Sequence, residues 1–403
     1  MKTKMKPNLR NALYIGTLCA VSYLAVYVAR NILSAVTPQM LETGNFTKDY
    51  IGNASSIYFI FYAVGQLING IIGDKIKAKY MLSMGLFLAG VTNFVFPYLA
   101  GSPQTALYIY GMTGFFLAMI YAPMTKVVAE NTDPIYTTRC SLGYTFASFL
   151  GSPLAGVIAG IMAWQSVFAT SSIILFAMAI TCFVCFTIFE RKGIVKYGQY
   201  DRKTESGKKP PLTSSLMLLI RRQIIKFSFI ALLTGVVRTT VVFWLPTYIA
   251  EYLNFPADKA AFLFTAATLV ICSAAFISVF VYERLGNNMD LTILVMFTSS
   301  TLFFGGCYLV SSPIPNMIFI VLAVISANAA ATMLWSKYCP SLRDTGMVSS
   351  ATGFLDFLSY MAAAASNAFS SFISWQILIA IWFALMVFGV IIALPFDKLK
   401  KKS

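Results

Sequence analysis

The sequence predicts an all-α membrane protein with twelve transmembrane helices in two pseudo-symmetric six-helix halves. The 403-residue chain is 58% hydrophobic and only 11% charged, with a mean hydropathy of +0.74. Soluble domains carry about 25% charged residues, so a soluble fold is excluded. Twelve apolar runs of about 20 residues fill the chain, and each is long enough to cross about 30 Å of hydrocarbon. One long polar segment separates the first six runs from the last six.

Short polar breaks or Gly/Pro positions separate the apolar runs. The first run is too long for a secretory signal and contains an arginine, and no small-residue cleavage site follows it. We therefore expect it to be a retained membrane helix. The runs begin near Asn11, Ile51, Tyr80, Thr105, Cys140, Ser166, Phe227, Lys259, Asp290, Pro315, Met347 and Trp375.

The polar interruption at residues 191–226 is rich in Lys, Gly and Pro. Such a composition is typical of a linker between domains. It predicts an N-terminal half at residues 1–190 and a C-terminal half at residues 227–403, joined by a basic cytoplasmic segment.

A weak internal repeat supports this division. Arg30 is followed eight residues later by Pro38, and Arg238 is followed eight residues later by Pro246. Eight helical residues span about 12 Å. If both prolines lie near the outer membrane interface, both arginines lie close to the centre of the bilayer.

The distribution of basic residues predicts the orientation. With the N-terminus inside, 26 of the 30 Lys and Arg residues fall on the cytoplasmic side, and only Lys48 and Lys259 on the opposite side. This asymmetry follows the positive-inside rule and places both termini in the cytoplasm. We expect a multi-pass protein of the plasma membrane, which is the inner membrane in a bacterium. The net charge of +15 thus reflects topology, and basic residues in short loops do not predict nucleic-acid binding.

The chain contains no histidine, which is the commonest metal ligand and proton shuttle. Seven cysteines lie in or beside apolar runs, and the one CxxC pair, Cys182 and Cys185, lies in the middle of a run. A redox or zinc site would need a more polar environment. The sequence also lacks a His/Asp/Ser constellation and a phosphate-binding P-loop. We expect no enzymatic activity, no catalytic residue, no metal site and no cofactor.

Arg30 and Arg238 are the two remaining basic residues, and both fall inside apolar runs. A charge at this depth costs several kcal/mol if it is unpaired. Asp356 is the only mid-helix acidic residue, and one carboxylate cannot neutralise two guanidiniums. A guanidinium matches a phosphate or carboxylate with two parallel hydrogen bonds, so one arginine from each half can hold an oxyanion. A purely structural ion pair is the alternative.

Several other side chains are candidates to line such a site. Tyr27 and Tyr23 precede Arg30 by three and seven residues and share its helix face. Tyr62 and Gln66 form a second pair, four residues apart; interfacial anchoring is the alternative for the tyrosines. Asp356 has three possible roles: recognition of a substrate amine or hydroxyl, proton coupling, or helix packing. Ordinary packing explains three further candidates equally well: Asn328, Trp244 and Tyr360.

The segment Gly70-Ile71-Ile72-Gly73-Asp74-Lys75, with Lys77 and Lys79, resembles the signature loop between helices two and three of the major facilitator superfamily. The usual Gly-Arg inside the loop is Lys77-Ala78 in this chain. The resemblance implies a major facilitator fold. It also implies a role in gating, not in substrate binding, for Gly70, Asp74, Lys75 and Lys79.

A second set of motifs is similar to the organophosphate:phosphate antiporter family, which includes the glycerol-3-phosphate and hexose-6-phosphate transporters. The motifs are Tyr23-xxx-Tyr27-xx-Arg30, Tyr62-xxx-Gln66, and Arg238 with Trp244-Leu245-Pro246-Thr247-Tyr248; residues 346–360 resemble the eleventh helix of that family. The resemblance implies that the two arginines bind the phosphate while the three tyrosines line its pocket.

The chain departs from that family at four places. Gln66 replaces a lysine of the glycerol-phosphate members, their fifth-helix histidine is absent, their Glu-Arg-Gly appears as Thr138-Arg139-Cys140, and Asp356 adds a negative charge. The chain thus keeps the two arginines and loses accessory positive charge. A smaller or singly charged anion therefore becomes an alternative substrate.

The resemblance implies a monomeric secondary active transporter in the lipid bilayer. It would exchange a small phosphorylated anion, a sugar phosphate or glycerol phosphate, for inorganic phosphate by alternating access. Two alternatives remain open. One is a symporter of another organic anion, such as a hexuronate, carboxylate or phosphonate, and the other is a transporter-like receptor for sugar phosphates.

Overall fold

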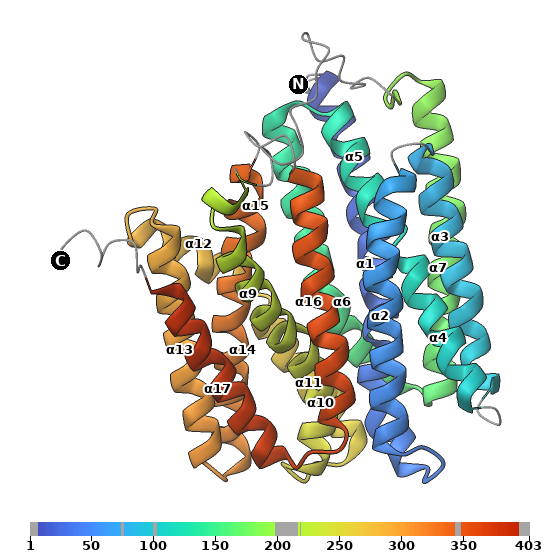
Figure 1. The fold of residues 1–403 in the computed structure, drawn as a ribbon. Helices are drawn as coiled ribbons and strands as arrows, with labels where there is room; N and C mark the ends of the chain where they lie inside the picture. Colours follow the sequence, from blue (N-terminus) through green and yellow to red (C-terminus); the bar gives the residue numbers. More distant parts are fainter. Residues whose placement is uncertain are drawn as a thin grey trace, which may run out of the picture. The chain divides into compact units, whose positions relative to one another are not determined.

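The computed structural model describes residues 7–73, 76–99, 103–197, 217, 219–342 and 348–394. All regular elements in this part of the chain are helices (Figure 1). The chain divides into two compact units, which are described separately. The first unit comprises Met1–Met40 and Ile57–Lys208, and the second comprises Leu41–Ser56 and Lys209–Ser403.

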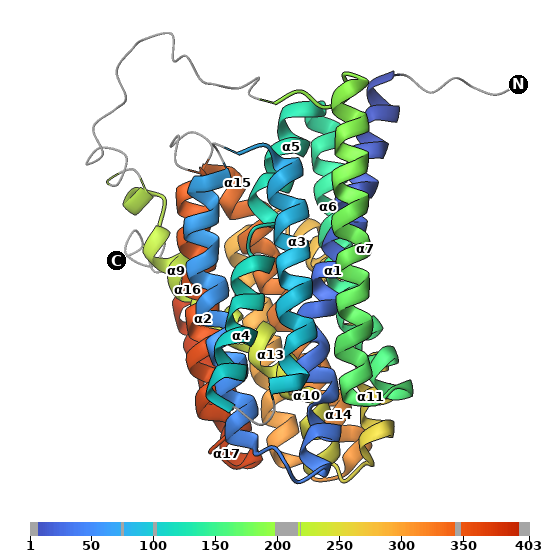
Figure 2. The same ribbon diagram turned by 90° about the vertical axis from the view of Figure 1, so that its right-hand side faces the viewer.

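Apart from residues 41–56, which belong to the second unit, the first unit contains the N-terminal helices. They are α1 (Pro7–Glu42), α2 (Lys48–Gly73), α3 (Ala78–Val95), the 3-10 turn η1 (Phe96–Leu99), α4 (Pro103–Leu117), α5 (Tyr121–Asn131), α6 (Pro134–Ile161) and α7 (Trp164–Arg191). Helix α3 packs side by side with α4 and α7 (Figure 2). The amide of Asn93 on α3 fixes the second contact, since it donates to the carbonyl of Phe168 at 3.3 Å and to Ser172 Oγ at 3.2 Å.

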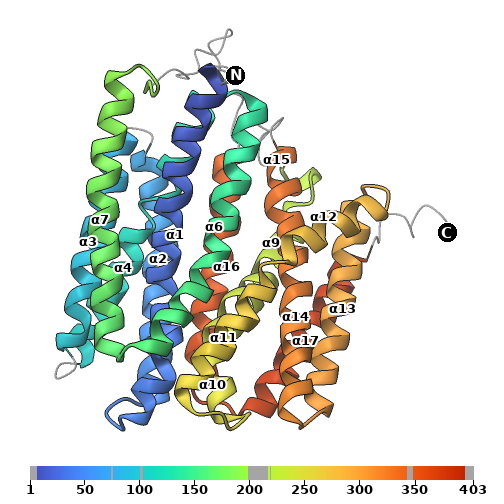
Figure 3. The same ribbon diagram turned by 180° about the vertical axis from the view of Figure 1, so that it is seen from behind.

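The second unit contains the remaining helices. They are α9 (Ile224–Gly235), the π-helical turn η2 (Val236–Val241), α10 (Val242–Glu251), α11 (Ala257–Ile271), α12 (Ala274–Arg284), α13 (Met289–Leu309), α14 (Pro313–Met333), the π-helical turn η3 (Leu334–Tyr338), α15 (Cys339–Ser341), α16 (Val348–Ser370) and α17 (Trp375–Ala393). Helix α13 packs against both α14 and α17 (Figure 3).

Eleven helices in the described part of the chain are long and apolar enough to cross a membrane. The remaining predicted run, which begins near Met347 and is the eleventh along the chain, corresponds to α16, which is not among these helices. Asp356 and several serines lower the hydropathy of α16. Its 23 residues still extend over about 34 Å, which is enough to cross the hydrocarbon core. The protein is therefore an all-α, multi-pass membrane protein.

Several of the apolar runs, among them the fourth, seventh, eighth and tenth, are not continuous α-helices. The fourth breaks between Leu117 and Tyr121, where the tighter bonds from Met119 N to Phe116 O (3.1 Å) and from Ile120 N to Leu117 O (3.3 Å) close the turn. The seventh changes to π-helical geometry in η2, ahead of a proline in α10. Because proline has no N–H to donate, helices often deviate next to it.

Candidate anion-binding site

Arg30 lies in α1 and is only 8% exposed. Its Nη1 donates a hydrogen bond to the Tyr27 hydroxyl at 3.4 Å. The guanidinium carbon lies 5.0, 5.1 and 5.2 Å from the ring centroids of Tyr27, Phe59 and Tyr62, so α1 and α2 together enclose the cation with aromatic rings. The ring faces attract a cation but carry no net charge, so they stabilise the guanidinium without neutralising it.

A row of tyrosines continues from Arg30 along α1. The Tyr23 ring lies 4.9 Å from Tyr27, 5.6 Å from Tyr121 of α5 and 6.0 Å from Tyr144 of α6. Helix α6 approaches α1 closely at Gly151, which has no Cβ; a Cβ added there would lie only 2.4 Å from the Tyr27 Cβ. The spacing within α1 predicted Tyr23 and Tyr27 on this face. Tyr121 and Tyr144 come from other helices, and no spacing in the sequence indicated them.

The predicted site residues on α2 are placed differently from each other. Tyr62 is buried against Arg30, whereas Gln66, one turn farther along the helix, is only half-buried. Phe59, which the sequence did not single out, precedes Tyr62 by three residues and contacts the same cation. The same helical periodicity that selected Tyr62 and Gln66 could have indicated Phe59.

Arg238 lies half-buried within the π-helical turn η2 of the second unit. Such turns are frequent at functional sites because they displace one side chain from the regular helical register. Helix α16 packs directly against this segment, since a Cβ on Gly235 would lie 2.4 Å from the Ser359 carbonyl oxygen. Thr240 also donates to the carbonyl of Ala363 on α16, at 3.4 Å.

Helix α16 therefore carries two of the predicted site residues past the turn that holds Arg238. Tyr360, next to Ser359, is buried, and Asp356 is half-buried one turn before it. Asn328 lies on α14, which also packs against η2. Arg238, Asp356, Tyr360 and Asn328 thus lie on three neighbouring helical segments of one unit.

Trp244 is placed in a separate aromatic cluster. It is fully buried in α10, about 9 Å along the helix from Arg238, and its ring lies 6.5 Å from the ring of Trp375. The Lys48 ammonium lies 5.7 Å from the Trp244 ring. Trp244 thus contacts Trp375 and Lys48, which also contact the C-terminal end of α10.

A charged cluster surrounds this end of α10. Lys48 Nζ lies 2.8 Å from Glu251 Oε2, and the Trp375 indole N–H donates to the same oxygen at 2.9 Å. The ammonium also lies 3.9 Å from the Trp375 ring centroid. Lys48 and Glu251 are 203 positions apart. The distribution of basic residues predicted Lys48 on the outer side, but no local pattern in the sequence indicated its partner.

Neighbouring polar contacts attach the same stretch of α2 to α16. Ser56 Oγ donates to the Ala364 carbonyl at 2.7 Å, and the Asn367 amide donates to Ser55 Oγ at 2.9 Å. Gly52 permits this approach, because a Cβ there would lie 2.8 Å from the Cβ of Ser371. The first turns of α2 therefore pack within the second compact unit.

We expect Glu251→Gln to lower the free energy of unfolding by about 0.5–1 kcal/mol, because the amide keeps an acceptor for Trp375 but loses the attraction to Lys48. The effect is small because the Lys48 and Glu251 side chains are 21% and 38% exposed. Thermal unfolding of Glu251→Gln, Lys48→Met and the double variant measures the interaction energy between the Lys48 and Glu251 side chains. Lys259→Met, at an exposed lysine near the start of α11, is the control. Strictly additive losses would show that the pair contributes nothing.

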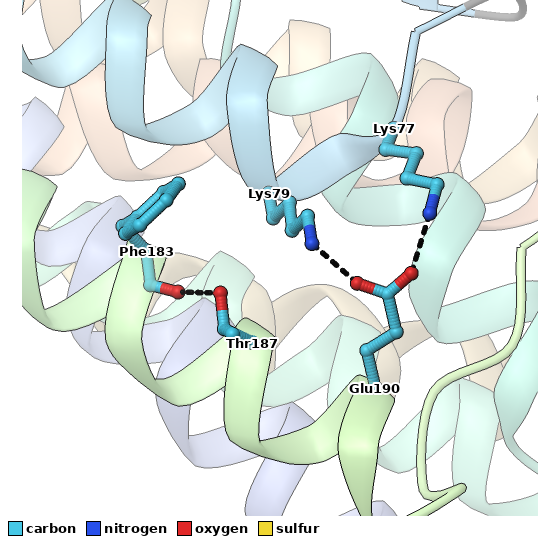
Figure 4. A network of polar contacts seen from close by, with 5 residues as sticks. All are labelled: Lys77, Lys79, Phe183, Thr187 and Glu190. Carbon is cyan, nitrogen blue, oxygen red and sulfur yellow. Dashed lines mark hydrogen bonds and ion pairs between the residues drawn. The ribbon is translucent and has the colours of Figure 1, made fainter.

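Only part of the predicted gating motif lies within the residues that the structure describes. Gly70 lies in α2, whereas Asp74 and Lys75 lie outside the described residues. Lys79, near the start of α3, pairs with Glu190 near the end of α7, and Lys77 Nζ lies 2.5 Å from the other oxygen of the same carboxylate (Figure 4). The sequence did not indicate Glu190, which joins α3 to α7.

Two further contacts lie beside the ion pairs of Glu190 with Lys77 and Lys79. On α7, Thr187 Oγ1 donates to the Phe183 carbonyl at 2.7 Å, one turn from Glu190 (Figure 4). The Lys77 ammonium lies 5.5 Å from the ring of Tyr197, which follows α7. Burial raises the pKa of Tyr197 to about 12, so its phenol stays neutral at physiological pH.

Comparison with known proteins identifies the family. The model of the Major Facilitator Superfamily matches residues 19–367. The glycerol-3-phosphate transporter of Bacillus subtilis (strain 168) is 23% identical over 271 residues, which are 62% of this chain and 60% of the transporter. The membrane sensor protein UhpC of Salmonella typhimurium (strain LT2) is 29% identical over 96 residues, 24% of this chain and 22% of the sensor. The chain thus spans less than two thirds of the length of either relative.

The hexuronate transporter of Bacillus subtilis (strain 168) is 20% identical over 366 residues, 86% of this chain and 84% of that protein. Among solved structures, a bacterial homologue of the human lysosomal transporter Spinster has a TM-score of 0.73 at 11% identity, with 97% of each chain covered. A D-xylose-proton symporter has a TM-score of 0.70 at 14% identity, covering 94% of this chain and 96% of the symporter. The matched fold and the family model together show that this chain belongs to the major facilitator superfamily.

Proposed function

We propose that this chain is a secondary active transporter of small organic anions, in which Arg30 and Arg238 bind the anionic group. The preferred substrate is a phosphorylated anion, a sugar phosphate or glycerol phosphate, exchanged for inorganic phosphate. The observation that carries this proposal is the guanidinium of Arg30, buried in a membrane helix among three aromatic rings.

The physical reason is the cost of a buried charge. A charged side chain within the bilayer core costs several kcal/mol, and such residues commonly mark substrate or ion pathways. An oxyanion complements a guanidinium with charge-assisted, bidentate hydrogen bonds, which are about twice as strong as neutral ones. Arg238, at the matched position of the second half, lies in a π-helical turn beside α14 and α16.

The names of similar proteins support a phosphorylated substrate. They include the Bacillus subtilis glycerol-3-phosphate transporter and a probable hexose phosphate transport protein of Chlamydia pneumoniae, which is 20% identical over 164 residues. Tyrosine hydroxyls near Arg30 add neutral donors of the kind that a phosphate or a polyhydroxyl group accepts.

Symport of a hexuronate is the second candidate function. Asp356, half-buried on the helix that packs against the Arg238 turn, adds a negative charge that would disfavour a doubly charged phosphate ester. A singly charged sugar acid would experience less repulsion. The similarity to the hexuronate transporter also extends over more of this chain than the similarity to the glycerol-3-phosphate transporter.

Counterflow in proteoliposomes tests the proposal. Purified protein is reconstituted with internal phosphate, and uptake of radiolabelled phosphate is competed with glycerol-3-phosphate, glucose-6-phosphate, glucuronate and a dicarboxylate. We expect internal phosphate to stimulate uptake, and a phosphate ester to be the strongest competitor. Protein-free liposomes and liposomes without internal phosphate are the controls.

The other outcomes separate the alternatives. Glucuronate uptake that follows an imposed proton gradient and ignores internal phosphate would favour symport and contradict exchange. Substrate-induced thermal stabilisation without any flux would favour a receptor. If none of these anions produces either flux or thermal stabilisation, the proposal that the protein binds anions is overturned.

A further inference from the structure

Asn328 on α14 lies at about the same level along the helix axes as Arg238. One hydrogen bond sets the register between α10 and α14, because the Tyr248 hydroxyl donates to Asn316 Oδ1. From Tyr248, Arg238 is ten residues back along the chain, or about 15 Å; from Asn316, Asn328 is twelve residues forward, or about 18 Å. The two helices run in opposite directions, so Asn328 and Arg238 lie within about one turn of the same level.

The turn that contains Arg238 packs against both α14 and α16. Helix α14 packs against η2, the turn that contains Arg238. Helix α16 packs against the same turn, and it contacts Gly235, just before the turn, and Thr240 within it, both near Tyr360. Arg238 is thus flanked by one helix that carries Asn328 and another that carries Tyr360.

Asn328 differs from the other asparagine on the same helix. The Asn316 side chain is fully bonded: its oxygen accepts from Tyr248, and its amide nitrogen donates to the carbonyls of Cys307 at 2.8 Å and Val310 at 2.7 Å. Asn328 is 4% exposed, yet its Oδ1 has no hydrogen-bond partner. Nearly all buried side-chain polar atoms in proteins are hydrogen-bonded, so the carbonyl oxygen of this amide lacks the partner that a purely structural role would give it.

We propose that the Asn328 amide binds a hydroxyl group of the substrate's organic part, next to the anionic group held by Arg238. This inference rests on the proposed function. A carboxamide offers both a donor and an acceptor, as a hydroxyl does, whereas a guanidinium only donates. Asn328 is therefore a specificity residue that distinguishes a hydroxylated organic anion from inorganic phosphate.

The orphaned amide gives this proposal a test that separates binding from structure. Replacing an unsatisfied buried polar group by an apolar one of similar size is nearly neutral or stabilising. Asn328→Leu is therefore expected to unfold at the same temperature as the wild type, or higher, in the absence of substrate. It is also expected to raise the inhibition constant of glucose-6-phosphate about fivefold relative to that of unlabelled phosphate, the loss typical of one neutral hydrogen bond.

The measurements are thermal unfolding with and without glucose-6-phosphate, and competition of radiolabelled phosphate uptake in proteoliposomes. Asn316→Leu is the matched control on the same helix, because it removes the hydrogen bonds of the Asn316 side chain and should lower the unfolding temperature without changing the ratio of the two inhibition constants. Asn328→Ala provides a second, smaller side chain.

Three results would overturn the inference. If Asn328→Leu shows the wild-type ratio of inhibition constants, the amide does not bind the substrate. If both Asn328 variants lose folded protein, the amide supports the structure. If the wild type itself neither exchanges phosphate nor is stabilised by any anion, the proposed function fails first and the specificity role fails with it.

Discussion

Replacement of Arg30 by lysine is expected to reduce the initial rate of anion uptake about 10- to 100-fold while leaving expression and monodispersity unchanged. Lysine keeps the positive charge and can still lie against the rings of Tyr27, Phe59 and Tyr62. It loses the planar fork of donors that binds an oxyanion through two hydrogen bonds at once. The substitution therefore isolates geometry from charge.

Arg238→Lys is expected to have an effect of similar size, because the second arginine occupies the matched position of the other half. Arg284→Lys, at the exposed end of α12, is the matched control and should transport normally. Uptake rates are normalised to the amount of folded protein in the liposomes. Wild-type rates in Arg30→Lys and Arg238→Lys would show that the guanidiniums do not bind the anion.

The periodicity of single helices was the most informative signal in the sequence. Spacings of three and four residues placed Tyr23, Tyr27 and Arg30 on one face of α1, and the structure brings their rings and the cation into contact. Apolar runs of membrane-spanning length likewise predicted the all-α membrane fold. Both signals are local, because they depend only on the 3.6-residue repeat and on the thickness of the bilayer.

Contacts between different helices could not be predicted from these local signals. Tyr121 and Tyr144 join the row of tyrosines only because α5 and α6 pack against α1. Glu190 joins Lys79 across more than a hundred residues, and Glu251 joins Lys48 across two hundred. No periodicity connects such pairs, since their proximity depends on the packing of complete helices.

The local geometry around Arg238 was also not predictable. Pro246 was visible in the sequence, but a π-helical turn at Val236–Val241 requires the neighbouring helices to support it. The same holds for Asn328, for which packing and binding were equally good interpretations of the sequence. Only the contrast with the fully bonded Asn316 favours binding.

Gly235→Ala is expected to impair transport more than tenfold, although the substituted residue contacts no substrate. A Cβ at this position would lie 2.4 Å from both the carbonyl oxygen and the hydroxyl of Ser359, and 2.8 Å from its Cα. These atoms include backbone, so α16 must move away from η2. Small residues at such contacts let membrane helices approach closely, and overpacking typically costs about 1–3 kcal/mol.

The displacement would reach the binding residues, because Tyr360 and Asp356 lie on α16 next to this contact, and Arg238 lies one turn after Gly235. A misplacement of about 1 Å can cost about 100-fold where several groups act on one ligand. Thermal unfolding and uptake are measured with Gly353→Ala as the matched control on α16, where an added Cβ would meet no atom within 4 Å. Gly353→Ala should be neutral or slightly stabilising, because alanine favours helix more than glycine does. Equal behaviour of the two variants would mean that the close approach of α16 at Gly235 does not position the binding residues.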